Sequence, residues 1–223
     1  IRESERLSGI VEELLDFSRM QSGRMTLTMD KIDILAELGE AVYMFSERAK
    51  SEHKYLLYEE PRMLSPVLGD INRLRQVFVN ILDNALKYTG EGGTISVVAS
   101  EENGYIRVAI SDNGCGIPPE HLPHLFERFY RADAARNRSG GGYGLGLAIA
   151  KEIADRLGGQ IMVESQKGKG SAFCTPLPSN FLHQLRPIFQ NKHDFSISMH
   201  HCFFYSSQPQ LCIKFRQHPI LSA

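Results

Sequence analysis

Residues 71–88 constrain the fold most strongly, because their side chains separate into two faces at the 3.6-residue period of an α-helix. One face carries Asn80, Asn84 and Lys87 about one turn apart, and Arg73 and Gln76 continue it. The other face is apolar and comprises Leu74, Val77, Phe78, Ile81 and Ala85. Because amide oxygens can ligate Mg²⁺ and a lysine can pair with phosphate, the polar face suits a cation-bridged polyphosphate. Alone, the pattern also fits a helix with one buried and one solvated face.

Composition and charge narrow the class of protein. A chain of 223 residues can bury one sizeable core and still carry an appendage. The formal net charge of −1 gives no electrostatic basis for binding nucleic acid or a membrane surface. No apolar run approaches the ~20 residues of a membrane span, and no signal peptide opens the chain. The start at Ile1 rather than methionine indicates a piece of a longer protein. A reducing cytoplasm is favoured because no CxxC spacing occurs among Cys115, Cys174, Cys202 and Cys212.

Apolar periodicity predicts helices and strands as far as residue 178. The expected helices cover residues 35–52, 71–88 and about 144–157, and the expected strands cover residues 25–32, 55–59, 95–99, 106–110, 160–165 and a last one that ends at residue 178. Asp70 is expected to cap the helix that begins at Ile71. Residues 119–143 show no period. Pro176, in the last strand, is expected at a sheet edge because proline cannot donate a ladder hydrogen bond.

The two ends of the chain differ from this middle part. Within residues 1–22, apolar side chains recur at heptad steps, such as Leu7 to Leu14. This spacing predicts a helix that packs in a bundle, or alternatively an amphipathic helix lying on its own domain. Residues 179–223 contain Asp194 as their one acid and five of the eight histidines, at positions 183, 193, 200, 201 and 218. No sustained period appears there, and this tail is assigned no function.

A second chemical feature is the carboxylate at the end of the expected strand 106–110. Asp112 is followed closely by Gly114 and Gly116, which let the backbone turn tightly and approach a flat base. A buried carboxylate can accept a hydrogen bond from the exocyclic amine of adenine, whereas guanine would present a repelling carbonyl. Such a charge-assisted bond contributes roughly 1.5–3 kcal/mol. A plain Asp-Asn-Gly turn is the alternative.

A third feature is the glycine-rich run at residues 140–147. It lacks the GxxxxGK[ST] pattern of a P-loop, and it follows a charged irregular segment rather than the strand that a dinucleotide fingerprint requires. It is therefore interpreted as a flexible loop that leads into a helix N-terminus at about Gly144, where backbone N–H groups can hold phosphate. Arg128 and Arg131 are expected to cover that phosphate on a mobile lid, or else to lie on a solvated loop.

Together, these stretches occur in an order and spacing that resembles the catalytic ATP-binding domain of bacterial sensor histidine kinases. Residues 80–88 resemble the N box of that family, 112–117 its G1 box, 126–131 its F box, 140–147 its G2 box and 168–173 its last glycine box. The likeness covers residues 1–178. It implies an α/β (α+β) two-layer sandwich of the Bergerat ATP-binding type in the gyrase, Hsp90, histidine kinase and MutL superfamily, with a mixed sheet packed on helices and preceded by one long helix.

The resemblance also implies a division into domains and a set of site residues. Residues 1–24 would be the second helix of a dimerisation and histidine-phosphotransfer hairpin, residues 25–178 the catalytic ATP-binding domain, and residues 179–223 an unassigned tail. Asn80 and Asn84 would be the Mg²⁺ ligands. The residues expected to bind Mg-ATP are Asn80, Asn84, Lys87, Tyr88, Asp112, Gly114, Gly116, Ile117, Arg131, Gly142, Tyr143, Gly144, Leu145, Gly146, Leu147 and Ser171.

One position favours a kinase over an ATPase within this superfamily. Hydrolysing members place a glutamate one turn before the metal-binding asparagine, whereas Asn80 stands there and cannot act as a general base. The family's phosphoacceptor is a histidine in a pattern such as H-E-x-x-T-P, and His53, His121 and His124 stand in no such context. The acceptor histidine is therefore expected upstream, and this chain is expected to bind ATP without phosphorylating itself.

The expected activity is transfer of the γ-phosphoryl group of ATP to that histidine, for relay to an aspartate on a response-regulator receiver domain. The expected partners are this regulator and the protein's own hairpin in a homodimer, with no nucleic acid. The resemblance further implies a cytoplasmic domain of a membrane-anchored parent. Two alternatives are a non-catalytic nucleotide-sensing module and a serine kinase of the anti-sigma-factor type, although the heptads in residues 1–22 disfavour the latter.

Overall fold

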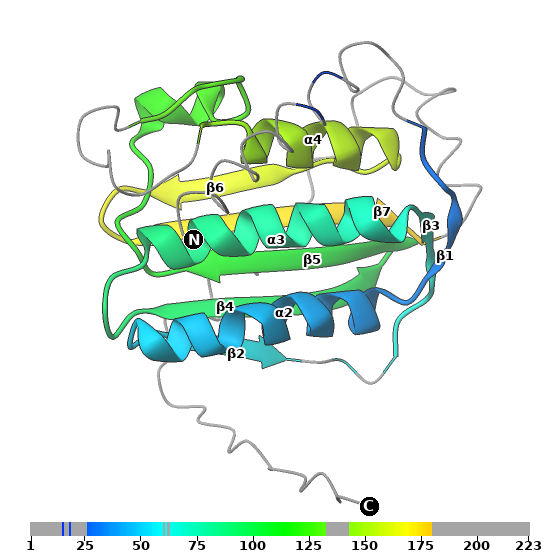
Figure 1. Cartoon of the computed structure of the whole chain (residues 1–223), viewed down its shortest axis with the longest axis horizontal. Coiled ribbons are helices and arrows are strands. Elements are labelled where there is room, and N and C mark those ends of the chain that lie inside the picture. Colours follow the sequence, from blue (N-terminus) through cyan, green and yellow to red (C-terminus); the bar gives the residue numbers. More distant parts are fainter. Residues whose placement is uncertain are drawn as a thin grey trace, which may run out of the picture.

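The computed structural model describes residues 15, 18, 26–59, 61, 63–132 and 143–179. In this part of the chain, a mixed five-stranded sheet carries three α-helices on one face, which gives two layers (Figure 1). The two-layer α/β fold expected from the sequence is therefore confirmed. The expected helix over residues 1–22, apart from Leu15 and Ser18, and the tail from residue 180 lie outside the described residues.

The five-stranded sheet has the strand order β2-β4-β5-β7-β6. Its strands are β2 (Tyr55–Glu59), β4 (Thr94–Glu102), β5 (Tyr105–Asp112), β6 (Met162–Gln166) and β7 (Gly170–Pro178). β2 pairs parallel with β4, and the other neighbours pair antiparallel. The hairpin of β4 and β5 forms around residues 103–104, as expected. In the register of β5 and β7, Asp112 lies opposite Ser171, so two expected site residues meet at one end of the sheet.

The helical layer consists of α2 (Ile34–Ser51), α3 (Ile71–Tyr88) and α4 (Gly146–Arg156), with α3 between the other two (Figure 1). The side chain of Asp33 accepts hydrogen bonds from the first turn of α2, and that of Asp70 does the same for α3. The α3 bounds and the Asp70 cap agree with the sequence prediction. A 3₁₀ helix, η1 (Pro119–His124), follows β5. None of the described helices is both long and apolar enough to cross a bilayer.

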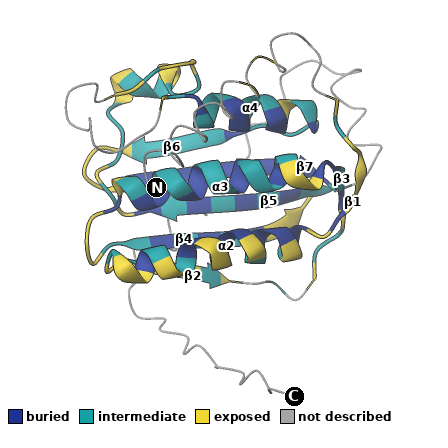
Figure 2. Cartoon of the chain, viewed as in Figure 1, coloured by how far each residue is buried: buried dark blue, intermediate teal, exposed yellow. Residues whose placement is uncertain are grey.

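The hydrophobic core lies between the sheet and the helices, and burial is deepest along α3 (Figure 2). The apolar face predicted for this helix is buried along its whole length, at Leu74, Val77, Phe78, Ile81 and Ala85. Burying one such large side chain contributes about 1.5–3 kcal/mol to folding. The buried face of α3 therefore fixes its polar edge against the ends of β5 and β7.

Some local predictions were wrong in extent. The strand expected from residue 25 is only β1 (Asp30–Ile32), and it pairs with an unexpected strand, β3 (Val67–Gly69), in a separate two-stranded sheet. Strands of three residues are too short to show an alternating pattern in the sequence.

Pro176 does not lie on an edge strand, since β7 runs between β5 and β6. It is tolerated because the ladder between β6 and β7 ends at Met162 and Cys174, before it reaches the proline.

Candidate functional site

A cavity of ≈ 230 Å³ opens between the polar edge of α3, the end of β5, η1 and the start of α4. Most of the site residues expected from the sequence line it, although they come from five separate stretches of the chain. Those that line the cavity are Asn80, Asn84, Lys87, Tyr88, Asp112, Gly116, Ile117, Arg131, Tyr143, Gly144, Gly146, Leu147 and Ser171. Among the remaining three, Gly114 forms a turn beneath the cavity, Leu145 is buried in the core, and Gly142 lies outside the described residues.

The two asparagines of α3 present their amide groups beside the start of α4. The Nδ2 of Asn80 donates to the carbonyl of Gly146 at 3.0 Å, and the Nδ2 of Asn84 donates to the carbonyl of Asn80 at 2.9 Å. Because the amide nitrogens are engaged within the protein, the Oδ1 atoms are the ends that can serve a cation. Neutral oxygen donors of this kind suit Mg²⁺.

Asp112 is the last residue of β5, and it is only 8% exposed to solvent. Its Oδ1 accepts a hydrogen bond from the N–H of Gly114 at 2.8 Å. Burial raises the pKa of the Asp112 carboxyl, while hydrogen bonds from the backbones of Gly114 and Ser171 partly offset this rise. A buried acceptor that still faces a cavity is the arrangement that a ligand N–H group requires.

The turn after Asp112 depends on glycine at two positions. A Cβ on Gly114 would lie 2.2 Å from the carbonyl oxygen of Tyr88, and one on Gly116 would lie 2.0 Å from that of Gln166. Gly116 also has a φ of +63°, which L-residues with side chains rarely adopt. The backbone is therefore packed closely here, with no room for a side chain at Gly114 or Gly116.

A serine pair that the sequence did not reveal holds this turn in place. The hydroxyl of Ser165 accepts from the N–H of Ile117 at 2.8 Å and donates to the carbonyl of Gly170 at 2.8 Å. It also lies 2.9 Å from the hydroxyl of Ser171. Ser165 could be identified only from the pairing of β6 with β7, which sets it opposite Ser171.

Two cationic side chains, those of Lys87 and Arg131, also line the cavity. Burial lowers the pKa of Lys87, and the nearby cations Arg131 and Arg48 lower it further, against the opposing effect of Asp83. The ammonium of Lys87 lies 5.4 Å from the ring centroid of Tyr88. A lysine whose pKa is lowered by neighbouring cations favours an anionic ligand beside it.

The start of α4 adds backbone donors to the same region. Gly146 is its first residue, and no side chain caps the first turn. The N–H groups of that turn are therefore left for a ligand or solvent, and the helix dipole favours a negative charge there. This start lies near the predicted position at Gly144, which instead has a φ of +72° and lies in the loop before the helix.

η1 and the segment that follows it form another part of the cavity lining. The Nδ1 of His121 lies 2.6 Å from the hydroxyl of Tyr130, and both residues line the cavity. The N–H of Phe129 donates to the carbonyl of Gly144 at 3.0 Å, which joins this segment to the loop before α4. The sequence gave no binding role to His121 or Tyr130, because nothing in an aperiodic segment indicates which side chains meet.

Taken together, the donor set fits an adenine nucleotide and a divalent cation. The cavity is lined by a buried carboxylate beside a tight glycine turn, by two cations, and by an uncapped helix N-terminus. The amide oxygens of Asn80 and Asn84 line the same cavity. This donor set provides partners for a base, for a divalent cation and for phosphates.

Comparison with known proteins agrees with this chemistry. A family model described as "Histidine kinase-, DNA gyrase B-, and HSP90-like ATPase" matches residues 69–180. A sensor-like histidine kinase, SenX3 of Mycolicibacterium smegmatis, is 35% identical over 178 residues, which cover 80% of this chain and 46% of that relative. The chain thus spans less than half the length of this curated relative.

Solved structures with the same fold include two histidine kinases. A full-length ShkA in complex with AMPPNP superimposes with a TM-score of 0.70 at 31% identity, over 79% of this chain and 37% of that one. Histidine kinase ThkA in complex with the response regulator protein TrrA has a TM-score of 0.63 at 26% identity, over 80% of this chain and 49% of that one.

Proposed function

The chain belongs to the histidine kinase-, DNA gyrase B- and HSP90-like ATPase family, and on that basis we propose that it is the ATP-binding catalytic domain of a two-component sensor histidine kinase. One observation supports this proposal above the others. The buried carboxylate of Asp112 faces the same cavity as the amides of α3 and the uncapped start of α4. The AMPPNP bound in the similar ShkA structure supports ATP as the ligand.

In this proposal each group around the cavity has one task. The Asp112 carboxylate accepts a hydrogen bond from the exocyclic amine of adenine, and the tight turn at Gly114 and Gly116 and the start of β7 at Ser171 lie beside it. The Oδ1 atoms of Asn80 and Asn84 would hold Mg²⁺. The phosphates would be bound by Lys87, by Arg131 and by the loop of residues 142–147.

Mg-ATP, when bound, supplies a γ-phosphoryl group that a histidine of another segment can accept. The protein's contribution is to hold the phosphates and neutralise their charge. The amide of Asn80 donates to Gly146 and cannot accept a proton from water, so water is not activated at this position. The phosphoryl group is thereby preserved for the histidine.

The wider assignments are also proposals. Residues 25–178 would form the catalytic domain, and residues 1–24 would contribute the second helix of the hairpin that dimerises and carries the acceptor histidine. The complex of ThkA with a response regulator supports a receiver domain as the partner. A cytoplasmic position in a membrane-anchored parent is proposed likewise.

The first test is nucleotide binding by the 223-residue chain, measured by calorimetry with Mg-ATP and Mg-GTP in parallel. Mg-ATP should bind at least about tenfold more tightly, because guanine would place a carbonyl against the carboxylate of Asp112. Binding of ATP should weaken when Mg²⁺ is removed with a chelator. Absence of heat with Mg-ATP would remove the basis of the proposed function.

The second test concerns phosphoryl transfer. The chain incubated with γ-labelled ATP should release phosphate only slowly and should carry no acid-labile label, since none of its histidines lies in an acceptor pattern. Rapid phosphate release would indicate an ATPase. Acid-stable label on a second protein's serine would favour a serine kinase instead.

A further inference from the structure

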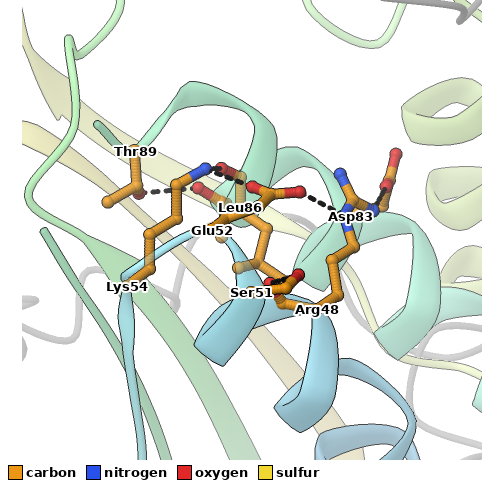
Figure 3. Close-up of polar contacts among 8 residues, drawn as sticks. Arg48, Ser51, Glu52, Lys54, Asp83, Leu86 and Thr89 are labelled. Carbon is orange, nitrogen blue, oxygen red and sulfur yellow. Dashed lines mark hydrogen bonds and ion pairs between the residues drawn. The ribbon is translucent and has the colours of Figure 1, made fainter. Parts of the chain in front are cut away.

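Four charged residues form a continuous ion-pair chain between α2 and α3, which we call the α2–α3 ion-pair chain (Figure 3). Its members are Lys54, Glu52, Arg48 and Asp83, paired in that order. Arg48 is the central residue, with its Nε 2.8 Å from the Glu52 carboxylate and its Nη1 2.6 Å from the Asp83 carboxylate. The chain therefore reaches from the last turn of α2 to a residue that lines the cavity.

The cavity end of this chain lies beside Lys87. Asp83 and Lys87 are four residues apart on α3, a spacing at which an aspartate and a lysine on a helix normally attract each other. In the described part of the chain, however, Asp83 forms its ion pair with Arg48 across the helix interface, and Lys87 is not within ion-pair distance of it. Lys87 instead lies above the ring of Tyr88.

This choice of partner matters because Asp83 carries the negative charge that acts on Lys87. Burial is the main cause that lowers the pKa of Lys87, Arg131 and Arg48 act in the same direction, and Asp83 acts in the opposite one. If the Asp83 carboxylate turned toward Lys87, it would neutralise the ammonium that the phosphates need. An anion already paired with Lys87 would also have to be displaced before a ligand could bind.

We propose that Arg48 is a positioning residue for nucleotide binding: it holds the Asp83 carboxylate against α2 and so keeps the ammonium of Lys87 available for phosphate. The inference rests on the proposed function for its ligand, but not for its geometry. Arg48 itself does not line the cavity, and its proposed positioning role is exerted through Asp83.

The remaining members of the α2–α3 ion-pair chain, Glu52 and Lys54, hold Arg48 in position. Its Nε is bound by Glu52, and the other carboxylate oxygen of Glu52 pairs with Lys54. Lys54 is largely buried, with 9% of its side chain exposed, and its Nζ donates to the carbonyl of Leu86 at 2.7 Å. Leu86 precedes Lys87 on α3. The α2–α3 ion-pair chain is therefore attached to α3 at both ends, through Lys54 and through Asp83.

The test is a double-mutant cycle on Mg-ATP affinity, measured by calorimetry on the full chain with Arg48→Met, Asp83→Asn and both substitutions together. Arg48→Met should weaken binding about tenfold, comparable with the loss of one charge-assisted contact. Asp83→Asn should strengthen binding, because it removes an anion beside the phosphates. In the Asp83→Asn background, Arg48→Met should weaken binding by less than about twofold, since no carboxylate remains to capture Lys87. Arg156→Met is the matched control, because Arg156 forms an ion pair within α4 and does not line the cavity.

Two outcomes of the cycle would overturn the inference. Equal weakening by Arg48→Met in both backgrounds would mean that Arg48 acts only through its own charge. Weakening by Asp83→Asn as large as that by Arg48→Met would mean that the ion pair is merely structural. Should Arg48→Met fail to fold, Glu52→Gln carries the test, because it loosens Arg48 without removing its charge and should weaken binding in the same direction.

A second measurement needs no nucleotide and separates the two proposals. The pKa of Lys87, followed by NMR of its side chain, should rise more in Arg48→Met than the same substitution raises it in the Asp83→Asn background, because direct loss of the Arg48 charge is common to both. It should stay close to its original value in Arg156→Met. An unchanged Lys87 pKa in Arg48→Met would refute the positioning role even if the chain binds Mg-ATP. A raised pKa in a chain that binds no nucleotide would leave the positioning intact and remove the proposed function.

Discussion

Replacing Asp112 by asparagine tests the base-binding end of the cavity with almost no change in shape. The carboxylate oxygen that accepts from the N–H of Gly114 at 2.8 Å would become an amide oxygen in the same place. The other oxygen would become an NH₂ group, which faces the exocyclic amine of adenine donor to donor. The substitution therefore removes one charge-assisted hydrogen bond and leaves the turn in place.

The expected loss follows from the burial of this group. Asp112 is 8% exposed, so solvent cannot replace the lost acceptor. A hydrogen bond to a charged group contributes about 1.5–3 kcal/mol, which corresponds to roughly tenfold to a hundredfold in affinity. Asp112→Asn should therefore bind Mg-ATP at least about tenfold more weakly than the unmodified chain.

The same substitution should not lower the stability of the nucleotide-free protein. Burial raises the pKa of Asp112 above its ordinary value of 3.8, so the fold favours the protonated carboxyl. Its contribution to the free energy of unfolding is fully present below that ordinary value and is lost as the pH rises through the raised pKa. The ionised carboxylate is therefore the less favourable form in this buried position, and a neutral amide avoids its cost.

The assay is calorimetric titration with Mg-ATP at neutral pH, together with thermal unfolding of each protein without nucleotide. Asp155→Asn is the control, because Asp155 pairs with Lys151 on the outside of α4 and does not line the cavity. Affinity unchanged in Asp112→Asn, or reduced equally in Asp155→Asn, would refute the assignment of Asp112 to adenine. A lower unfolding temperature for Asp112→Asn would refute the account of its burial.

Two further predictions concern the charge and the core behind the cavity. Burial and neighbouring cations lower the pKa of Lys87, so its ammonium loses its charge at a lower pH than usual. Mg-ATP affinity, measured by calorimetry across alkaline pH, should therefore fall as the pH rises through that lowered pKa. Lys87→Met should abolish this pH dependence. Phe78→Ala should lower the free energy of unfolding by about 3–5 kcal/mol in urea titrations, since the ring is fully buried in α3; a loss below 1 kcal/mol would contradict the described core.

Local patterns in the sequence predicted the elements that carry the site. The bounds of α3 and its Asp70 cap follow from a long two-faced period, and the β4–β5 hairpin follows from strict alternation on both sides of Gly104. Asp112 could be located because it ends such a strand before two glycines. Each of these signals lies within a single stretch of the chain. Each is long enough to be recognised without knowing which other elements it packs against.

The contacts between distant stretches could not be predicted in this way. Arg48 and Asp83 are 35 positions apart, and nothing in the period of either helix indicates that they pair. Ser165 and Ile117 are 48 positions apart and meet only through the β6–β7 register. Such pairings depend on how the helices pack and on which strands become neighbours. The resemblance to a known family supplied the list of site residues but not these supporting contacts.

The place of β7 in the sheet has a consequence for how the protein becomes competent during synthesis. This strand is the last described one along the chain, yet it lies between β5 and β6, and its Ser171 backbone bonds to the Asp112 side chain. A ribosome-bound chain that ends before residue 170 would already contain the asparagines, the aspartate and the glycine turn. It would still lack β7, whose Ser171 and Phe173 line the cavity. A slip of β7 by a single position would put Ala172 where Ser171 belongs and reverse its faces. Nucleotide binding would therefore require that β7 has paired with β5 in the correct register.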